Sequence, residues 1–95
     1  MKIYLTVVVR AKDAYREQVK KTLLNMVAET RKEVVVELYN LHQSTEDKNV
    51  FTFYEIWKDQ ASLDMHNEQP YIKDFQSIIE EQLAEAPLIV KTVLI

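Results

Sequence analysis

The sequence predicts an α+β fold in which a four-stranded antiparallel sheet carries its helices on one face. The first observation is the order of patterns along the 95 residues, which is strand, helix, strand, strand, helix, strand. The second is that right-handed crossovers arrange this order as a ferredoxin-like sheet with the first and third strands in the centre. The third is that these two strands are apolar on both faces, as central strands are.

The first half of the chain reads as one strand followed by one helix. Residues 2–10 are rich in β-branched and aromatic types and present apolar side chains to both faces of a strand. Asp13 is suited to cap a helix over about residues 14–32. The buried face of that helix is predicted from apolar positions at helical spacing: Val19, Leu23, Met26, Val27 and Thr30.

The second half begins with a hairpin. A second strand is expected over about residues 34–43 and a third over Val50–Trp57, joined by a polar loop. Asp59 is expected to cap a short helix through His66, and Pro70 to open the next helix, which ends near Pro87. Residues 88–95 form the fourth predicted strand. The buried positions of the last helix are predicted to be Ile72, Phe75, Ile78, Ile79 and Leu83.

Composition excludes several classes of protein. Lys and Arg total 12 against 15 Asp and Glu, a net charge of -3 without basic clusters, which argues against nucleic-acid or polybasic membrane binding. The absence of cysteine excludes disulfides, thiolate metal sites and a Cys nucleophile, and the absence of glycine argues against phosphate-cradling loops. No apolar run approaches the roughly 20 residues that span a bilayer. We expect one cytoplasmic domain over residues 1–95.

The sheet face without helices is predicted to be apolar. On the first strand Tyr4 and Val8 point to that face, and on the third strand Val50, Tyr54 and Ile56 do so. Large exposed apolar patches on monomers usually mark an interface. We therefore expect a homodimer in which two sheets pack face to face, with room for a small apolar ligand between the sheet and the partner.

Glu55 is the first candidate for chemistry. It lies on the same strand face as Phe53 and Trp57, because side chains two residues apart share a face. A carboxylate beside aromatic rings in an apolar cavity has its charged form disfavoured and suits proton transfer. The commoner alternative is a Glu at the rim of the sheet, paired with Lys or Arg.

The histidines and tyrosines supply the other candidates. His66 ends the short helix, where the following break can aim its ring toward the sheet, or where its charge can complement the helix dipole. His42 is expected to be exposed near the end of the second strand, and without metal-ligand spacing we expect no metal site. Four tyrosines are candidates to hydrogen-bond a quinol or ketone oxygen or simply to pack: Tyr4, Tyr39, Tyr54 and Tyr71.

The segment Phe53–Asp59, followed by Leu63, His66, Pro70 and Tyr71, resembles the signature of the antibiotic biosynthesis monooxygenase family. Residues 41–47 resemble the quinol monooxygenase branch of that family. The resemblance follows the element order along the whole chain and is most specific over residues 39–75. It implies a dimeric α/β barrel in which each ferredoxin-like subunit has a pocket between its sheet and helices.

The resemblance also implies oxidation of a quinol-like or polycyclic aromatic by O₂ without flavin, haem or metal. The deprotonated quinol donates the electron to O₂, so the protein binds, orients and deprotonates it. His66 is implied as the base or hydrogen-bond partner and Glu55 as the group that orients it or tunes its pKa. Trp57 and Phe53 would pack against the substrate rings, and Tyr39 and Tyr71 are further candidates for substrate binding.

Two other functions remain open. One is an isomerase of a small phosphorylated ketone, as in an autoinducer-processing relative, with Glu55 and His66 as acid and base. The other is a dimeric module that binds a small ligand without turnover. The haem-degrading branch is set aside, because its Asn on the first strand has no counterpart in residues 2–9.

The entry to the second strand departs from the family pattern. Relatives commonly have Pro-Gly-Cys where this chain has Val34, Val35 and Val36, and Glu37 follows where an apolar residue is common. A valine does not comfortably adopt the positive φ that glycine supplies. We expect a different backbone path there, with an effect on the neighbouring pocket.

Overall fold

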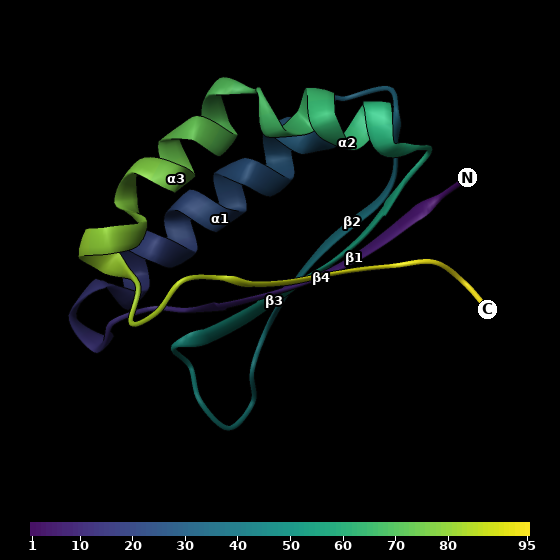
Figure 1. Ribbon diagram of the computed structural model, residues 1–95. Helices are drawn as coiled ribbons and strands as arrows, with labels where there is room; N and C mark the ends of the chain where they lie inside the picture. The colour runs from purple at the N-terminus through teal and green to yellow at the C-terminus, as the bar shows by residue number, and fades with distance from the viewer.

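The computed structural model describes residues 1–95 and contains one sheet and one helical layer. All three α-helices lie on the same side of the sheet (Figure 1). No helix combines the length and hydropathy that crossing a membrane requires. In chain order the elements are β1 (Ile3–Arg10), the 3-10 turn η1 (Asp13–Tyr15), α1 (Arg16–Thr30), β2 (Val36–Gln43), β3 (Val50–Trp57), α2 (Gln60–Asn67), α3 (Pro70–Gln82) and β4 (Leu88–Thr92).

The sheet has the strand order β2-β3-β1-β4, and every neighbouring pair is antiparallel. The predicted ferredoxin-like fold with β1 and β3 in the centre is therefore confirmed. Leu5 on β1 lies between Glu55 of β3 and Lys91 of β4, and Val7 lies between Phe53 and Ile89. This register sets the order of side chains across the face that the helices cover.

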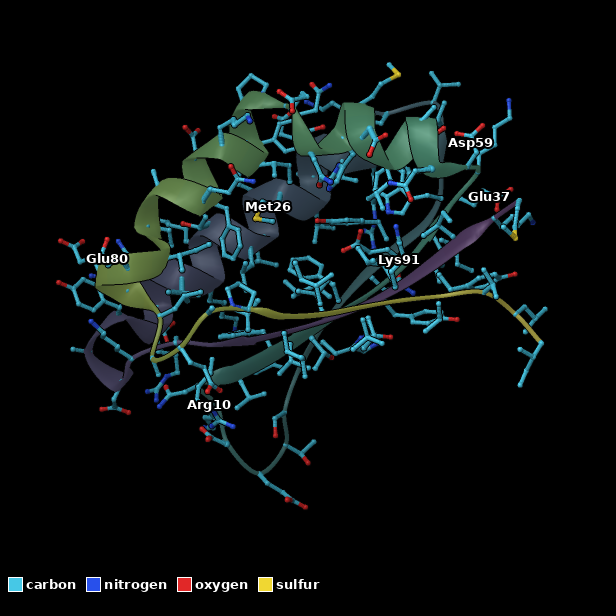
Figure 2. All side chains as sticks on the ribbon, in the orientation of Figure 1. Arg10, Met26, Glu37, Asp59, Glu80 and Lys91 are labelled. Atoms are coloured by element: carbon cyan, nitrogen blue, oxygen red, sulfur yellow. The ribbon has the colours of Figure 1, made fainter.

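The core lies between the sheet and the helices. Alternate residues of β1 and β3 are buried there, and α1 contributes the predicted positions, including Met26, whose side chain lies between α1 and the sheet (Figure 2). In and after α3, Ile72, Phe75 and Leu83 are buried as predicted, whereas Ile78 and Ile79 are only partly buried. Helix α3 therefore covers part of the helical face of the sheet but leaves unfilled space between its side chains and the strands.

The two predicted aspartate caps differ in outcome. Asp59 caps α2, because its Oδ1 accepts hydrogen bonds from the Ser62 backbone N–H at 2.9 Å and from the Ser62 hydroxyl at 2.7 Å. Asp13 does not cap α1, so that prediction is wrong. It lies inside the turn η1, and its carboxylate instead accepts hydrogen bonds from Arg16 and Asn49. The intervening turn makes α1 start later than predicted.

The entry to β2 follows a path without left-handed residues. The strand begins at Val36 and its pairing with β3 is irregular between Val36 and Leu38, while Val34 is almost fully exposed. No residue in the chain has a positive φ. The connection is therefore made without the positive φ that a glycine would supply there, and the predicted difference from the path in relatives stays a prediction. The fourth strand is also shorter than predicted, because β4 ends at Thr92.

The other face of the sheet carries no helix. Tyr54 and Ile56 of β3 lie opposite Thr6 and Tyr4 of β1, in the positions that alternate with the buried ones. Leu88 and Val90 of β4 are exposed. This apolar surface, which we call the open face, comprises Tyr4, Val8, Tyr54, Ile56, Leu88 and Val90.

Candidate functional site

A cavity of about 200 Å³ lies between the sheet and the helices. Ten of its fifteen lining residues are hydrophobic, and they come from every strand of the sheet and from α1 and α3. The polar lining residues include Glu55, His66, Asn67 and Gln76. The cavity thus lies on the helical face, where the family resemblance implies a pocket, and not between two sheets. The apolar lining includes Leu5, Val7, Met26, Phe53, Phe75 and Ile89.

Glu55 is buried in this wall, with 3% of its surface exposed. Its Oε1 accepts a hydrogen bond of 2.8 Å from the indole N–H of Trp57. Burial raises the pKa of Glu55 to about 7, the charge of Glu33 adds to the rise, and the indole hydrogen bond opposes it. The alternative of a rim carboxylate paired with Lys or Arg is wrong, because Glu55 forms no ion pair and is enclosed by apolar side chains.

His66 is equally buried, in the last turn of α2. Its ring centroid lies 4.4 Å from that of Trp57, at an angle of 40° between planes, and 5.5 Å from that of Tyr39. The ring therefore turns toward the sheet, and its burial disfavours the charged form that the helix-dipole alternative requires. Asp59, which caps the first turn of α2, fixes the opposite end of this helix.

A third acidic residue completes the site. Glu33, in the turn between α1 and β2, places Oε2 at 2.8 Å from His66 Nδ1. The Tyr71 hydroxyl donates to the same oxygen. The resemblance implied that Glu55 lies next to His66, but Glu33 occupies that place. Glu55 forms its side-chain hydrogen bond with Trp57 and none with His66. The glutamate that touches the histidine was thus not foreseen.

Burial also shifts the pKa of the histidine and of the two tyrosines of the site. It lowers the pKa of His66, and the hydrogen bond and charge of Glu33 oppose that change. Burial, together with the hydrogen bond to Glu33, raises the pKa of Tyr71. Burial and the charge of Glu55 also raise the pKa of Tyr39. At neutral pH the two phenols keep their protons and the imidazole is favoured in its neutral form.

The remaining candidates divide between the two faces of the sheet. Tyr39 and Phe53 line the cavity, and their ring centroids lie 5.1 Å apart. Trp57 is fully buried behind Glu55 and His66, and Tyr71 reaches Glu33 rather than the cavity wall. Tyr4 and Tyr54 lie on the open face, away from the cavity, so for these two only the packing alternative fits the structure.

His42 lies on the other face of the sheet from His66. It is paired with Thr52 in positions that alternate with the buried face, and it is exposed. No group of three or more His, Asp and Glu side chains is arranged to hold a metal ion.

Several lining residues had no sequence signal. Met26, Asn67 and Gln76 contribute to the wall, but their positions on helices predict only packing or solvent exposure. Glu33 follows a helix in a charged stretch, where a solvent-exposed side chain is the ordinary expectation. Only the fold brings it beside His66.

Comparisons with known proteins agree with this architecture. The family model described as "Antibiotic biosynthesis monooxygenase" matches residues 2–77. "Putative monooxygenase YcnE" of Bacillus subtilis (strain 168) is 31% identical over 86 residues, which are 90% of each chain. The structure of PA3566 from Pseudomonas aeruginosa has a TM-score of 0.93 at 26% identity and covers 99% of this chain and 94% of its own. Rv0793 from Mycobacterium tuberculosis shares the fold, with a TM-score of 0.93 at 17% identity over 100% and 96% of the two chains.

Proposed function

The chain belongs to the antibiotic biosynthesis monooxygenase family, and from this premise we propose that it is a cofactor-independent monooxygenase of a small quinol-like aromatic. The observation that carries the proposal is the apolar cavity whose wall holds one buried imidazole and one buried carboxyl group, His66 and Glu55. An apolar pocket with a few convergent polar groups of perturbed pKa is the usual form of a small-molecule site.

The cavity favours a compact aromatic substrate. Its volume of about 200 Å³ is below the roughly 300–1,000 Å³ typical of pockets for drug-sized ligands. Phe53, Phe75 and Tyr39 offer ring surfaces to a flat ligand. One or two fused rings therefore suit it better than an extended polycyclic system.

In the proposed reaction His66 is the base. Its Nδ1 is engaged by Glu33, and Nε2 has no hydrogen-bond partner within the chain. Nε2 accepts the proton of a substrate hydroxyl, and the resulting electron-rich anion reduces O₂. One oxygen atom enters the product and the other leaves as water, with all four electrons supplied by the substrate. The protein contributes orientation and proton transfer.

A specific observation favours one alternative. Glu55 has a pKa raised to about 7, and it lines the same cavity as His66. A protonated carboxyl group and a neutral imidazole form an acid and base pair suited to isomerising a ketone. Such a reaction rearranges its substrate without consuming O₂.

Oxygen consumption tests the proposal. Reduced naphthoquinones and small phenols are supplied to the protein in an oxygen electrode, with buffer blanks that subtract spontaneous oxidation. We expect protein-dependent uptake that falls about a hundredfold in His66→Ala, the size expected for loss of a general base. Incorporation of one atom from ¹⁸O₂ into the product identifies monooxygenation.

His42→Ala is the matched control, because it removes the other histidine from an exposed position on the opposite face. It should keep the wild-type rate. Full uptake by His66→Ala would contradict the assigned base. Rearranged substrate without O₂ uptake would favour the isomerase, and unchanged ligand with tight binding would favour a module without turnover.

The proposal includes a homodimer formed through the open face. Its apolar side chains are Tyr4, Val8, Tyr54, Ile56, Leu88 and Val90, and patches of this kind usually mark an interface. Tyr54→Glu is expected to raise the dimer dissociation constant about a hundredfold, equivalent to about 3 kcal/mol, by placing like charges in the interface. Sedimentation equilibrium measures it. Leu24→Glu, at an exposed apolar position on α1, is the control and should leave the association unchanged.

A further inference from the structure

We propose that Glu33 is a positioning residue for His66, held in place by Tyr71, and that it leaves Nε2 as the free nitrogen of the ring. The proposal rests on two contacts of one carboxylate oxygen, Glu33 Oε2. This oxygen lies 2.8 Å from His66 Nδ1 and also accepts a hydrogen bond from the Tyr71 hydroxyl. The inference deepens the proposed function, on which its kinetic consequence rests. The arrangement of protons in the ligand-free protein follows from the contacts alone.

The geometry determines which nitrogen carries the proton. A carboxylate oxygen only accepts hydrogen bonds, so an imidazole nitrogen at 2.8 Å must donate to it. Neutral His66 is therefore protonated on Nδ1 and has its lone pair on Nε2. A carboxylate in the same position fixes the tautomer of the histidine in hydrolytic triads.

Three separate elements hold the cluster together. Glu33 follows α1, where its backbone N–H donates to the Thr30 carbonyl at 2.9 Å. Arg31, two residues before Glu33, donates from Nη2 to the Tyr39 carbonyl at 3.0 Å, which ties this turn to β2. His66 comes from α2, and Tyr71 comes from the first turn of α3. The carboxylate is thus anchored at its backbone and at its tip.

The polar surroundings of His66 come from every element packed against it. Glu33 reaches it from the α1–β2 turn, Tyr71 from α3 and Tyr39 from β2, while Glu55 of β3 lines the same cavity and forms its side-chain hydrogen bond with Trp57. Of the two carboxyl groups, only Glu33 is in hydrogen-bond contact with the ring. Tyr71 competes with His66 for the same oxygen, because both donate to Oε2.

The two variants at this cluster should therefore act in opposite directions on the histidine. Glu33→Gln removes the negative charge, so the pKa of His66 falls further and the preference for Nδ1–H is lost. Tyr71→Phe removes the competing donor, so the carboxylate interacts more strongly with the ring and the pKa of His66 rises. If Glu33 had a purely structural role, the two variants would not shift the pKa of His66 in opposite directions.

The experiment is a ¹⁵N-imidazole NMR titration of the intact ligand-free protein. Only two histidines contribute signals, and His42→Gln assigns those of His66. We expect the wild type to show the Nδ1–H tautomer and Glu33→Gln to show a substantial Nε2–H population with a lower pKa. Tyr71→Phe should keep Nδ1–H with a higher pKa. Glu37→Gln, at an exposed carboxylate paired with Lys2, is the matched control and should leave the signals of His66 unchanged.

An Nε2–H tautomer in the wild type would overturn the proposal, as would an unchanged tautomer and pKa in Glu33→Gln. If Glu33→Gln does not fold, Tyr71→Phe decides: a raised pKa of His66 supports the proposal and an unchanged pKa overturns it. With a quinol that the wild type oxidises, Glu33→Gln should lower kcat about 10- to 100-fold with a smaller effect on KM. Absence of O₂ uptake by the wild type would reject the proposed function without altering the NMR result.

Discussion

The rings of His66 and Trp57 lie with their centroids 4.4 Å apart and their planes inclined by 40°. The edge of the same indole donates its N–H to Glu55 at 2.8 Å. One aromatic side chain therefore supports the two buried polar groups of the cavity wall, the imidazole through ring contact and the carboxyl group through a hydrogen bond. The candidate base and the candidate acid are held by a fully buried residue that does not line the cavity.

Trp57→Phe separates these two roles. The new ring still packs against His66, but Glu55 loses its only side-chain donor. A buried polar group without its partner costs about 1–3 kcal/mol, so we expect a loss of that size in the free energy of unfolding. The pKa of Glu55 should also rise above about 7, because the indole hydrogen bond lowers it.

Urea unfolding and a ¹³C-carboxyl NMR titration measure the two effects of Trp57→Phe. A double-mutant cycle with Glu55→Leu separates the hydrogen bond from the loss of ring volume. Strictly additive free energies would show that the contact between the indole and the carboxyl group does not stabilise the fold.

The raised pKa of Glu55 makes stability depend on pH. Below about pH 4.5 both the folded and the unfolded states are protonated at this position. Between about 4.5 and about 7 the folded state keeps a proton that the unfolded state has released, so this group makes the free energy of unfolding fall as pH rises. The contribution lost by the upper end of this range is up to about 3 kcal/mol.

Glu55→Gln should remove that fall, so the variant gains stability relative to the wild type between pH 5 and pH 8 in urea titrations. His66 contributes the opposite slope, because its lowered pKa makes stability rise toward neutral pH. The difference between the two proteins isolates Glu55, since His66 is common to both. A constant difference across the range would mean that Glu55 ionises in the folded state as it does in the unfolded chain.

Filling the cavity should block ligand binding with little effect on folding. Val7 lies between Phe53 and Ile89 on the face that lines the cavity, so Val7→Phe places a ring in that space. We expect at least a tenfold loss of affinity for 1-naphthol, measured by calorimetry, equivalent to about 1.4 kcal/mol. The free energy of unfolding should fall by less than the roughly 1–3 kcal/mol that overpacking costs in a filled core.

Leu24→Phe, on the exposed side of α1, is the control for Val7→Phe and should bind 1-naphthol as the wild type does. Unchanged affinity in Val7→Phe would place the ligand elsewhere on the protein.

Much of the fold could be predicted because local patterns and global topology agree. The bounds of β3 follow from an apolar run that starts after a polar loop and ends before the capping Asp59. The shared face of Phe53, Glu55 and Trp57 follows from the period of two along a strand. The bounds of α1 and β4 were less accurate, because a 3-10 turn and the end of strand pairing leave no clear mark in the sequence.

By itself the sequence determined the element order, the central strands and the face on which Glu55 and Trp57 lie, because these depend on periodicity along one segment. The tertiary structure alone decided which acidic residue meets His66. Glu33 is 33 residues away from His66 and lies in a turn, where no periodicity relates the two. Their contact exists because the end of α1, the end of α2 and the start of α3 converge over the sheet. Because the contact is buried, the hydrogen bond from His66 to Glu33 can determine which ring nitrogen of His66 carries the proton.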